Sequence, residues 1–519
     1  MPSRTSKPRA HYALVAAALA ATLALAGCTG TSTPAATSSS GATDSTISIA
    51  VSSAPVSLDP AALAEGQQGF VWDSIYDTLL LIGNKGEIKP NAAKSWDYSA
   101  DGKTLTLKLN KGMTFSNGDP VNAAAVKATL ERTAKTPGTQ QSHAQAIESI
   151  DAPDSTTVVL HLKEPDATLL PSLGYGLGVI ADPKTLNDDR TKLNPVGSGP
   201  YTLDTAKTVN GSTYVLNRRS DYWNEKAYPF KTITIKVIAD QTAAYNALQA
   251  GEVDASLVDS SQAPQLKAAG FNITTIKATA VAAIFLADRA GTIVKPLADV
   301  RVRQAINMAF AREDYVKSLL KGVGTPTDQI FNPKGAAYDA SLQDLYPHDV
   351  KKAKELLSKA GYPNGFDVTM PSTILSKNFE PAISQSLGDI GIKVTWDPQP
   401  PSNTVGAILS KKYGMFFFFD GFNTPARQML SEFGPGAFLN PFGTSDPTLD
   451  KMVQQANSTV DIAKSNALIK KVNQYTVKNA LIAPILYPGA TYATKKGYAY
   501  LDQGSGATPN IRQYGLSTK

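Results

Sequence analysis

One stretch of the chain restricts the fold class more than any other, because residues 233–251 have the pattern of a strand followed at once by a helix. Apolar and polar residues alternate from Ile233 to Val237, which is the period of a half-buried strand. Asp240 then offers a helix N-cap, and Gly251 supplies a helix stop after an apolar stripe. A strand that leads directly into a helix is typical of α/β architecture.

The same two patterns recur in both halves of the chain. Period-two alternation covers residues 46–51, 105–109 and 392–396, while Asp299 and Asp349 are placed to cap amphipathic helices. Strands and helices that mix in this way predict α/β lobes and argue against an all-β or an all-helical protein. The chain has 519 residues, of which 42% are hydrophobic, and it exceeds the size at which one core usually suffices. We therefore expect at least two lobes.

The N-terminal segment predicts export from the cytoplasm. Arg4, Lys7 and Arg9 precede an apolar run over residues 13–26. This run is shorter than the roughly 20 apolar residues that a transmembrane helix needs, and no later segment approaches that length. The run ends in Leu-Ala-Gly followed by Cys28, which resembles the lipobox of bacterial lipoproteins. In that motif the cysteine sulfur is acylated and the chain is cut just before it.

Cys28 is the only cysteine of the chain, so an intrachain disulfide framework is impossible. A free thiol in an oxidising compartment would be a liability unless it were modified. We therefore predict a signal peptide over residues 1–27 and a lipid anchor at Cys28; the alternative is an ordinary secretory peptide with an incidental cysteine. Residues 28–45 are almost entirely small and polar, which predicts a disordered tether.

The net charge argues against nucleic acid as a partner. The formal charge of the whole chain is +6 at pH 7, and the predicted signal peptide holds three of these positive charges. About +3 is left on nearly five hundred residues, which is too weak to attract a polyanion.

A series of short motifs runs in a fixed order along the mature chain. They are 57–60 (SLDP), 75–79 (IYDTL), 89–96 (KPNAAKSW), 101–104 (DGKT), 111–121 (KGMTFSNGDPV), 195–201 (PVGSGPY), 221–223 (DYW), 248–254 (LQAGEVD), 300–306 (VRVRQAI), 354–362 (KELLSKAGY) and 483–487 (APILY). Together these motifs resemble the peptide-type, family 5 extracytoplasmic solute-binding proteins of ABC importers. The resemblance covers nearly the whole mature chain.

This resemblance implies a two-lobed α/β fold of the periplasmic-binding-protein type II class, with mixed sheets and a ligand cleft between the lobes. Lobe I is expected to comprise residues 46–282 plus 487–519, and lobe II residues 283–486. The resemblance also implies a membrane permease and cytosolic ATPases as partners. A tethered receptor works as a monomer, so we expect a monomer, and we expect no cofactor. The lipobox fits either the outer surface of a Gram-positive cell or a periplasm.

The most informative stretch for the ligand site is residues 415–423. Its four consecutive phenylalanines predict a strand buried on both faces, which ends at Asp420. In peptide-binding members of the family, an aspartate just after this strand receives the ligand's amino group. Here Gly421 and Phe422 stand for the usual Gly-Trp, and Asn423 falls near the expected acid. Either Asp420 replaces that acid, or amine recognition is lost; a turn or cap is the alternative role for Asp420.

Aromatic side chains complete the predicted ligand site. An apolar sleeve for side chains or sugar rings could be formed by Trp72, Tyr76, Phe285, Phe422 and Phe433, although aromatics at the ends of elements are more often core residues. The ligand-binding set predicted from the sequence is therefore Asp420, Gly421, Phe422, Asn423, Phe285 and Tyr76.

Nothing in the sequence indicates catalysis or a metal site. The chain has four histidines and shows no His-Glu-x-x-His motif, no paired cysteines and no Gly-x-Ser-x-Gly elbow. We predict a solute receptor without catalytic residues or metal ligands, with oligopeptides as the first ligand class, oligosaccharides or sugar conjugates as the second and metal chelates as the third. A secreted hydrolase that uses acids brought together by folding, or a purely structural lipoprotein, are the alternatives of another class.

Overall fold

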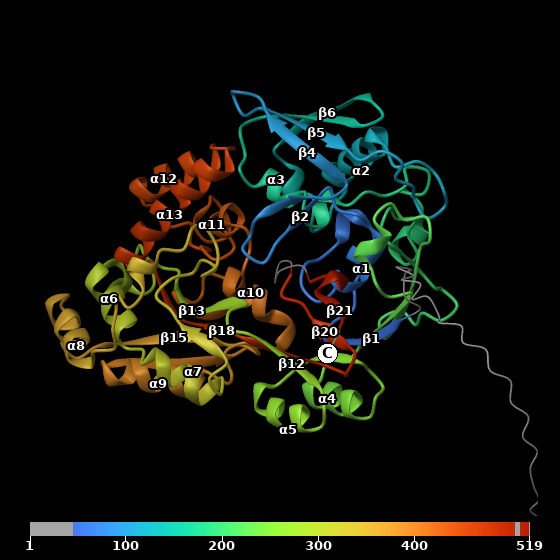
Figure 1. The fold of residues 1–519 in the computed structure, drawn as a ribbon. Helices are drawn as coiled ribbons and strands as arrows, with labels where there is room; N and C mark the ends of the chain where they lie inside the picture. The colour runs from blue at the N-terminus through green and yellow to red at the C-terminus, as the bar shows by residue number, and fades with distance from the viewer. Residues whose placement is uncertain (1–44, 504–508, 518–519) are drawn as a thin grey trace, which may run out of the picture. The chain divides into compact units, whose positions relative to one another are not determined.

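The structure is a computed structural model that describes residues 45–503 and 509–517. The predicted signal peptide, Cys28 and all of the predicted tether except Ser45 lie outside the described residues. Strands and helices mix throughout both described halves of the chain (Figure 1), which confirms the α/β prediction. Within the described ranges, no helix is both long enough and apolar enough to cross a membrane.

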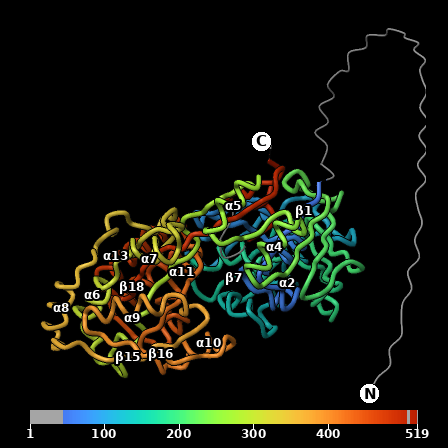
Figure 2. The backbone as a smooth tube through the Cα atoms, turned by 90° about the horizontal axis from the view of Figure 1, so that it is seen from below, coloured from blue at the N-terminus to red at the C-terminus, as the bar shows by residue number. Residues whose placement is uncertain are grey.

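A seven-stranded mixed sheet organises the first lobe. Its order is β12-β19-β11-β1-β10-β9-β8, and β1 pairs in parallel with both β10 and β11, while the remaining pairs are antiparallel. The strands are β1 (Thr46–Val51), β8 (Tyr201–Leu203), β9 (Thr213–Arg218), β10 (Thr232–Val237), β11 (Ala255–Val258), β12 (Asn272–Ile276) and β19 (Ala490–Thr494). The late strand β19 lies between β11 and β12, and α5 packs against it; the C-terminal part of the chain, coloured red, passes near α5 in both views (Figure 1, Figure 2).

A second, antiparallel sheet, β4-β5-β7-β6, belongs to the same half of the chain. Its strands are β4 (Ala93–Tyr98), β5 (Thr104–Leu109), β6 (Ile147–Asp154) and β7 (Thr157–Leu162), and the helix α2 (Ala123–Lys135) packs on them. Leu105, Leu107 and Leu109 of β5 point into one core, as their period-two spacing predicts. The smaller elements of this half are α1 (Gly69–Ile75), β2 (Leu80–Ile82), β3 (Ile88–Pro90), α3 (Leu169–Ser172), α4 (Gln241–Gln249) and α5 (Ala263–Ala268).

A four-stranded antiparallel sheet, β14-β18-β13-β17, organises the second lobe. Its strands are β13 (Ala280–Leu286), β14 (Gly324–Pro326), β17 (Met415–Gly421) and β18 (Ile482–Pro488). One face packs against α6 (Val300–Met308), α7 (Arg312–Leu319), α8 (Val350–Lys359), α9 (Glu380–Asp389) and the parallel pair β15 (Phe366–Ser372) and β16 (Ile392–Pro398). The other face packs against α11 (Pro425–Phe433), α12 (Pro447–Asn457) and α13 (Ile462–Lys478). The remaining elements are α10 (Thr404–Leu409) and the hairpin β20 (Tyr498–Tyr500) and β21 (Tyr514–Leu516).

Because its two faces are both covered, this sheet needs apolar side chains on both sides of each strand. In β17, Phe417 stacks on Phe379 in one core, with ring centroids 4.8 Å apart. Phe416 stacks on Phe285 in the other core, with centroids 5.4 Å apart. The prediction of a strand buried on both faces is therefore confirmed.

The three N-caps predicted from the sequence are also confirmed. A carboxylate oxygen of Asp240 accepts a hydrogen bond from the backbone N–H of Ala243 at 2.7 Å, and α4 begins directly after it. Asp299 and Asp349 cap α6 and α8 in the same way. Each cap satisfies a backbone donor that the first helical turn would otherwise leave without a partner.

The chain passes between the seven-stranded and the four-stranded sheet at two adjacent places. Residues 277–279 connect β12 to β13, and Gly489 alone connects β18 to β19. The backbone N–H and the hydroxyl of Thr279 both donate to the carbonyl oxygen of Pro488, at 2.9 and 3.0 Å, so the two connections are tied together. A Cβ at Gly489 would lie 2.5 Å from the carbonyl oxygen of Ile276, so this position requires glycine.

Candidate ligand-binding site

A cavity of about 620 Å³ adjoins the two connections between the sheets. Its walls include Ala278 and Thr279 of the first connection, Ala280 at the start of β13, and Gly489 of the second connection. The loop after β17 and the ends of β11 and β19 supply further walls, so segments far apart in the sequence meet there. A volume of this size suits a ligand of drug-like dimensions.

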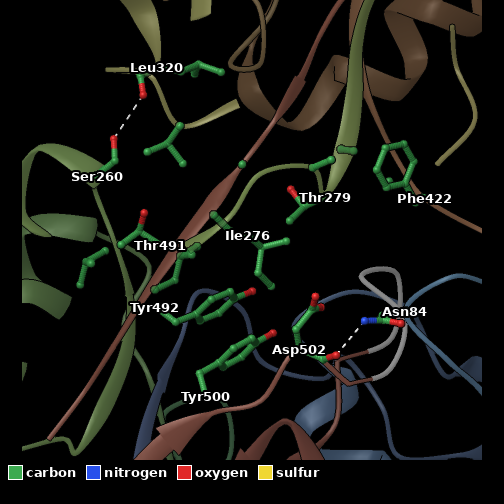
Figure 3. A pocket seen from close by; sticks show the side chains of 18 of the residues that line it. Asn84, Ser260, Ile276, Thr279, Leu320, Phe422, Thr491, Tyr492, Tyr500 and Asp502 are labelled. Carbon is green, nitrogen blue, oxygen red and sulfur yellow. Dashed lines mark hydrogen bonds between the residues drawn. The ribbon is translucent and has the colours of Figure 1, made fainter. Parts of the chain in front are cut away.

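On one side of the cavity, polar contacts join the two lobes. The side-chain amide of Asn332 donates to the carbonyl oxygen of Asn84 at 3.1 Å. The ammonium of Lys334 lies 2.5 Å from a carboxylate oxygen of Asp502. The amide of Asn84 in turn donates to the backbone carbonyl of Asp502 at 2.8 Å (Figure 3). These contacts hold both lobes against the same rim of the cavity.

A second contact between the lobes lies on another part of the cavity wall. The hydroxyl of Ser260 donates to the carbonyl oxygen of Leu320 at 3.3 Å (Figure 3). Beside it, Asp259 accepts hydrogen bonds from the backbone and the hydroxyl of Ser261, at 2.8 and 2.6 Å. These bonds, with the charge of Lys321, hold the pKa of the Asp259 carboxyl below its usual range.

The charges of the cavity balance and lie at its rim. Among the described lining residues the charged ones are Asp259, Lys321, Lys334 and Asp502, two of each sign, and all four are solvent-exposed. The described residues contain no group of three or more histidine, cysteine or acidic side chains that could hold a metal ion. The buried part of the wall is lined by Gly83, Val258, Phe422, Thr491, Tyr500 and Gln513, which are all uncharged.

Aromatic side chains form part of the inner wall. The rings of Tyr492 and Tyr500 stack in parallel, with centroids 3.6 Å apart and an interplanar angle of 6° (Figure 3). Across the cavity, Phe422 packs edge-on against Tyr487 at 5.3 Å. The cavity therefore combines aromatic surface with uncharged polar groups.

Three of the six residues that we predict from the sequence to bind ligand lie on the cavity wall. Gly421, Phe422 and Asn423 all line the cavity. The backbone N–H of Asn423 donates to the side-chain oxygen of Gln428 at 3.1 Å, so the first turn of α11 holds this loop. Ligand contact by these three residues stays a prediction.

Asp420 is not among the residues that line the cavity. The residue as a whole is half-buried, but its carboxyl group is enclosed and accepts a hydrogen bond from the side-chain amide of Gln428. The same amide donates to Glu432 at 2.9 Å. Burial raises the pKa of Asp420 to about 7, and it raises the pKa of Glu432 as well, with the charge of Asp420 adding to the effect. The two carboxyl groups thus interact with each other and share the amide of Gln428, and Asp420 does not line the cavity.

Tyr76 and Phe285 are also absent from the cavity wall. The hydroxyl of Tyr76 donates to the carbonyl oxygen of Leu58 at 2.8 Å, and the ring is fully buried in the first-lobe core. Phe285 stacks on Phe416 in the second-lobe core. Both residues have the packing role that we named as the alternative for aromatics at element ends, and neither is carried into the proposals below.

Two buried residues of the wall escaped the sequence reasoning. Thr491 on β19 and Gln513 just before β21 both line the cavity, with 2% and 4% of their surface exposed. Neither lies in a motif or a periodic stretch. The only available signal was the family resemblance, which assigns the extreme end of the chain to the first lobe.

Two lobes with mixed sheets, joined by two connections beside a cavity, give this chain the fold of the type II periplasmic binding proteins. The profile of "Bacterial extracellular solute-binding proteins, family 5 Middle" matches residues 87–438, which is more than half of the chain. The chain belongs to this family 5 of bacterial extracellular solute-binding proteins. It is a family of binding proteins that act outside the cytoplasm, and its members capture solutes for ABC importers.

The relatives carry different names and ligands. The glutathione-binding protein GsiB of Escherichia coli O6:K15:H31 (strain 536 / UPEC) is 29% identical over 442 residues, which cover 81% of this chain and 85% of the relative. The structure of DppA from Helicobacter pylori in complex with the peptide STSA has a TM-score of 0.74 at 24% identity, covering 91% and 98% of the two chains. NikA from Brucella suis, in complex with Fe(III)-EDTA, has a TM-score of 0.78 at 21% identity, covering 91% and 100%. The structural likenesses show the fold.

Proposed function

We propose that the solute captured by this chain is a short peptide or a peptide-like molecule, held in the cavity beside the two connections. The observation that carries the proposal is the cavity itself, about 620 Å³ in volume and walled by both lobes and by the loop Gly421–Asn423. A micromolar dissociation constant would need only about 8 kcal/mol of net binding free energy. The names of GsiB and of the DppA complex, which refer to glutathione and to a peptide, support this ligand class.

We propose further that residues 277–279 and Gly489 are the hinges, in place of boundaries at 283 and 487. Both sequence-predicted positions fall inside strands, β13 and β18, whose backbone hydrogen bonds resist bending. Rotation about the two short connections would open the cavity, and the contacts between the lobes would favour the closed form.

The cellular setting of this proposal follows the sequence. Acylation of Cys28 would anchor the chain as a monomeric lipoprotein to the outer side of the membrane. From there it would deliver its solute to a permease that is driven by cytosolic ATPases. The family membership supports the importer, and the lipobox motif supports the anchor.

An oligosaccharide or sugar conjugate is the second candidate ligand. The observation that favours it is the stacked pair Tyr492 and Tyr500 beside an uncharged polar wall, because aromatic faces pack well on sugar rings.

The experiment that tests the proposal is mass spectrometry of small molecules released by denaturing the purified mature chain. Calorimetry with each released compound should follow. Recovery of a peptide that rebinds with micromolar or tighter affinity is the expected result. Recovery of a sugar would favour the second candidate, and recovery of a compound that the chain converts to product would contradict a pure binding function.

A further inference from the structure

The guanidinium group of Arg427, in the second lobe, is held by side chains of the first lobe. Arg427 lies in the first turn of α11, and 10% of its side chain is exposed. Its Nη2 atom lies 2.6 Å from a carboxylate oxygen of Glu65 and 3.3 Å from Nε2 of His143. The guanidinium carbon lies 4.2 Å from the ring centroid of Tyr175. We call Arg427 and these three partners the Arg427 latch, because they join α11 to the first lobe.

The latch adjoins the cavity from both lobes. Gln67 lines the cavity and follows Glu65 closely in sequence, and Asn423 lines it just before α11. A rotation about the two proposed hinges would move α11 away from Glu65 and His143 as it opened the cavity. The latch is therefore made in the closed form and broken in the open form.

The contact between Arg427 and His143 requires an uncharged imidazole. The nitrogen atoms of a guanidinium only donate hydrogen bonds, so Nε2 of His143 must accept, and it can accept only when it carries no proton. An imidazolium would instead place two positive charges 3.3 Å apart in a half-buried contact. Burial and the charge of Arg427 lower the pKa of His143 to about 4, although the charge of Glu65 acts in the opposite direction.

The other elements that pack against the turn of His143 bring no free charge to it. This turn, Ser142–Ala144, packs against α2 and α3, and α3 has no charged residue. The charged residues of α2 are engaged elsewhere or exposed: Arg132 pairs with Asp59, Lys127 pairs with Glu131, and Lys135 is exposed. The charge of His143 is therefore governed by Arg427 and Glu65.

The buried carboxyl of Asp420 responds to closure in the opposite sense, but weakly. Glu65 lies in the first lobe, and its charge raises the pKa of Asp420, so this pair favours the closed form in acid. Burial inside the second lobe is the largest cause of the raised pKa, and the charge of Glu65 is the smallest of the causes. Glu432, the other acid of α11, interacts with Asp420 within the same lobe. His143 therefore sets the sign of the response.

We propose that the Arg427 latch closes only when His143 is uncharged, so that closure of the lobes releases a proton and acid favours opening and release of the solute. This inference rests on the proposed hinges and capture function and adds a regulation to them. In the open form the imidazole returns to water and to its ordinary pKa of 6.5. The open form then binds a proton below about pH 6.5, which the closed form binds only near pH 4, so the closed form loses ground as the pH falls between these values.

The test follows the distance between the lobes by single-molecule fluorescence energy transfer. Cys28→Ser removes the only native cysteine from the mature chain. Ala124→Cys on α2 and Lys451→Cys on α12, both exposed, then carry one dye on each lobe. We expect the ratio of closed to open molecules to fall about tenfold between pH 7.5 and pH 5.5. A ratio that stayed constant or rose in acid would overturn the inference.

Two histidine variants make a matched pair. His143→Gln keeps an oxygen that can accept from Arg427 and cannot be charged, so the closed form should persist down to pH 5.5. His161 pairs with Asp151 at 3.0 Å inside the first lobe, so His161→Gln should retain the full response to acid. Arg427→Met removes the latch and should lower the closed fraction at pH 7.5. If His143→Gln responded to acid as strongly as the unaltered chain, another group would be the switch and the proposal would fail.

The same measurement in excess casein digest separates the inference from the proposed function. Peptides of the digest should shift the molecules toward the closed form at pH 7.5 if the chain captures peptides. Closure by the digest with no dependence on pH would uphold the peptide assignment and refute the latch. A response to acid that depends on His143, with no response to the digest, would uphold the latch and refute the peptide assignment.

Discussion

Replacement of Gln428 by methionine should both destabilise the protein and loosen the loop that lines the cavity. Gln428 is 1% exposed and its side chain makes three hydrogen bonds: its amide nitrogen donates to Asp420 and Glu432, and its amide oxygen accepts from the backbone of Asn423. Methionine keeps the length of the side chain and removes all three bonds. Buried groups left without partners cost roughly 1–3 kcal/mol each, so we expect a loss of about 4 kcal/mol in the free energy of unfolding.

The effect on binding should be smaller, because only one of the three bonds holds the loop. Loss of a bond to a neutral backbone group is worth about 1 kcal/mol, which corresponds to about fivefold weaker binding of the recovered solute. Urea unfolding followed by circular dichroism measures the stability, and calorimetry measures the affinity. The control is Gln455→Met at an exposed position of α12, where a change within about 0.5 kcal/mol is expected. If the two variants were equally stable, or if Gln428→Met bound solute as tightly as the unaltered chain, the argument that Gln428 positions the loop would be refuted.

Three further predictions concern a buried carboxyl, the rim and the anchor. The pKa of Asp420 is raised to about 7 from 3.8, so its stabilising effect is complete below its unfolded pKa and is lost as the pH rises through about 7. Between pH 5.5 and 7.5 the unaltered chain should lose more unfolding free energy than Asp420→Asn, and parallel urea-derived stability curves would contradict this. Lys334→Met breaks an exposed ion pair with Asp502, so it should weaken solute binding by no more than about fivefold by calorimetry and leave the Tm unchanged; a larger loss would disprove a merely supporting role. Cys28→Ser should move the chain from the membrane fraction to the soluble fraction of cells, and retention on the membrane would rule out a lipid anchor at this residue.

Local sequence patterns were sufficient to predict many elements of the fold. The alternation in β10, the caps at Asp240, Asp299 and Asp349, and the phenylalanines of β17 each depend on neighbours within a few residues. The way in which β19 inserts between β11 and β12 could not be predicted from such patterns, because it brings together residues more than 200 positions apart. Only the family resemblance placed the C-terminal segment in the first lobe.

The ligand site was predicted less completely for the same reason. Phe422 and Asn423 lie on the cavity wall because they follow a strand that ends there, which is a local rule. Thr491 and Gln513 reach the wall only through long-range packing, and nothing in their immediate sequence distinguishes them from surface residues. Asp420 shows a further limit: its position at the strand end was correct, but the direction of its carboxyl group depends on Gln428, eight residues later on a helix.

The balanced charges at the rim of the cavity have a consequence for the speed of capture. Two lysines and two aspartates of opposite sign produce little net field beyond their own surroundings, so a solute in free diffusion is neither pulled toward the opening nor repelled from it. Association should then depend on the size and concentration of the solute and hardly at all on ionic strength. A receptor that works outside the cytoplasm, where salt varies with the surroundings, would collect its solute at a steady rate in dilute and in saline media alike.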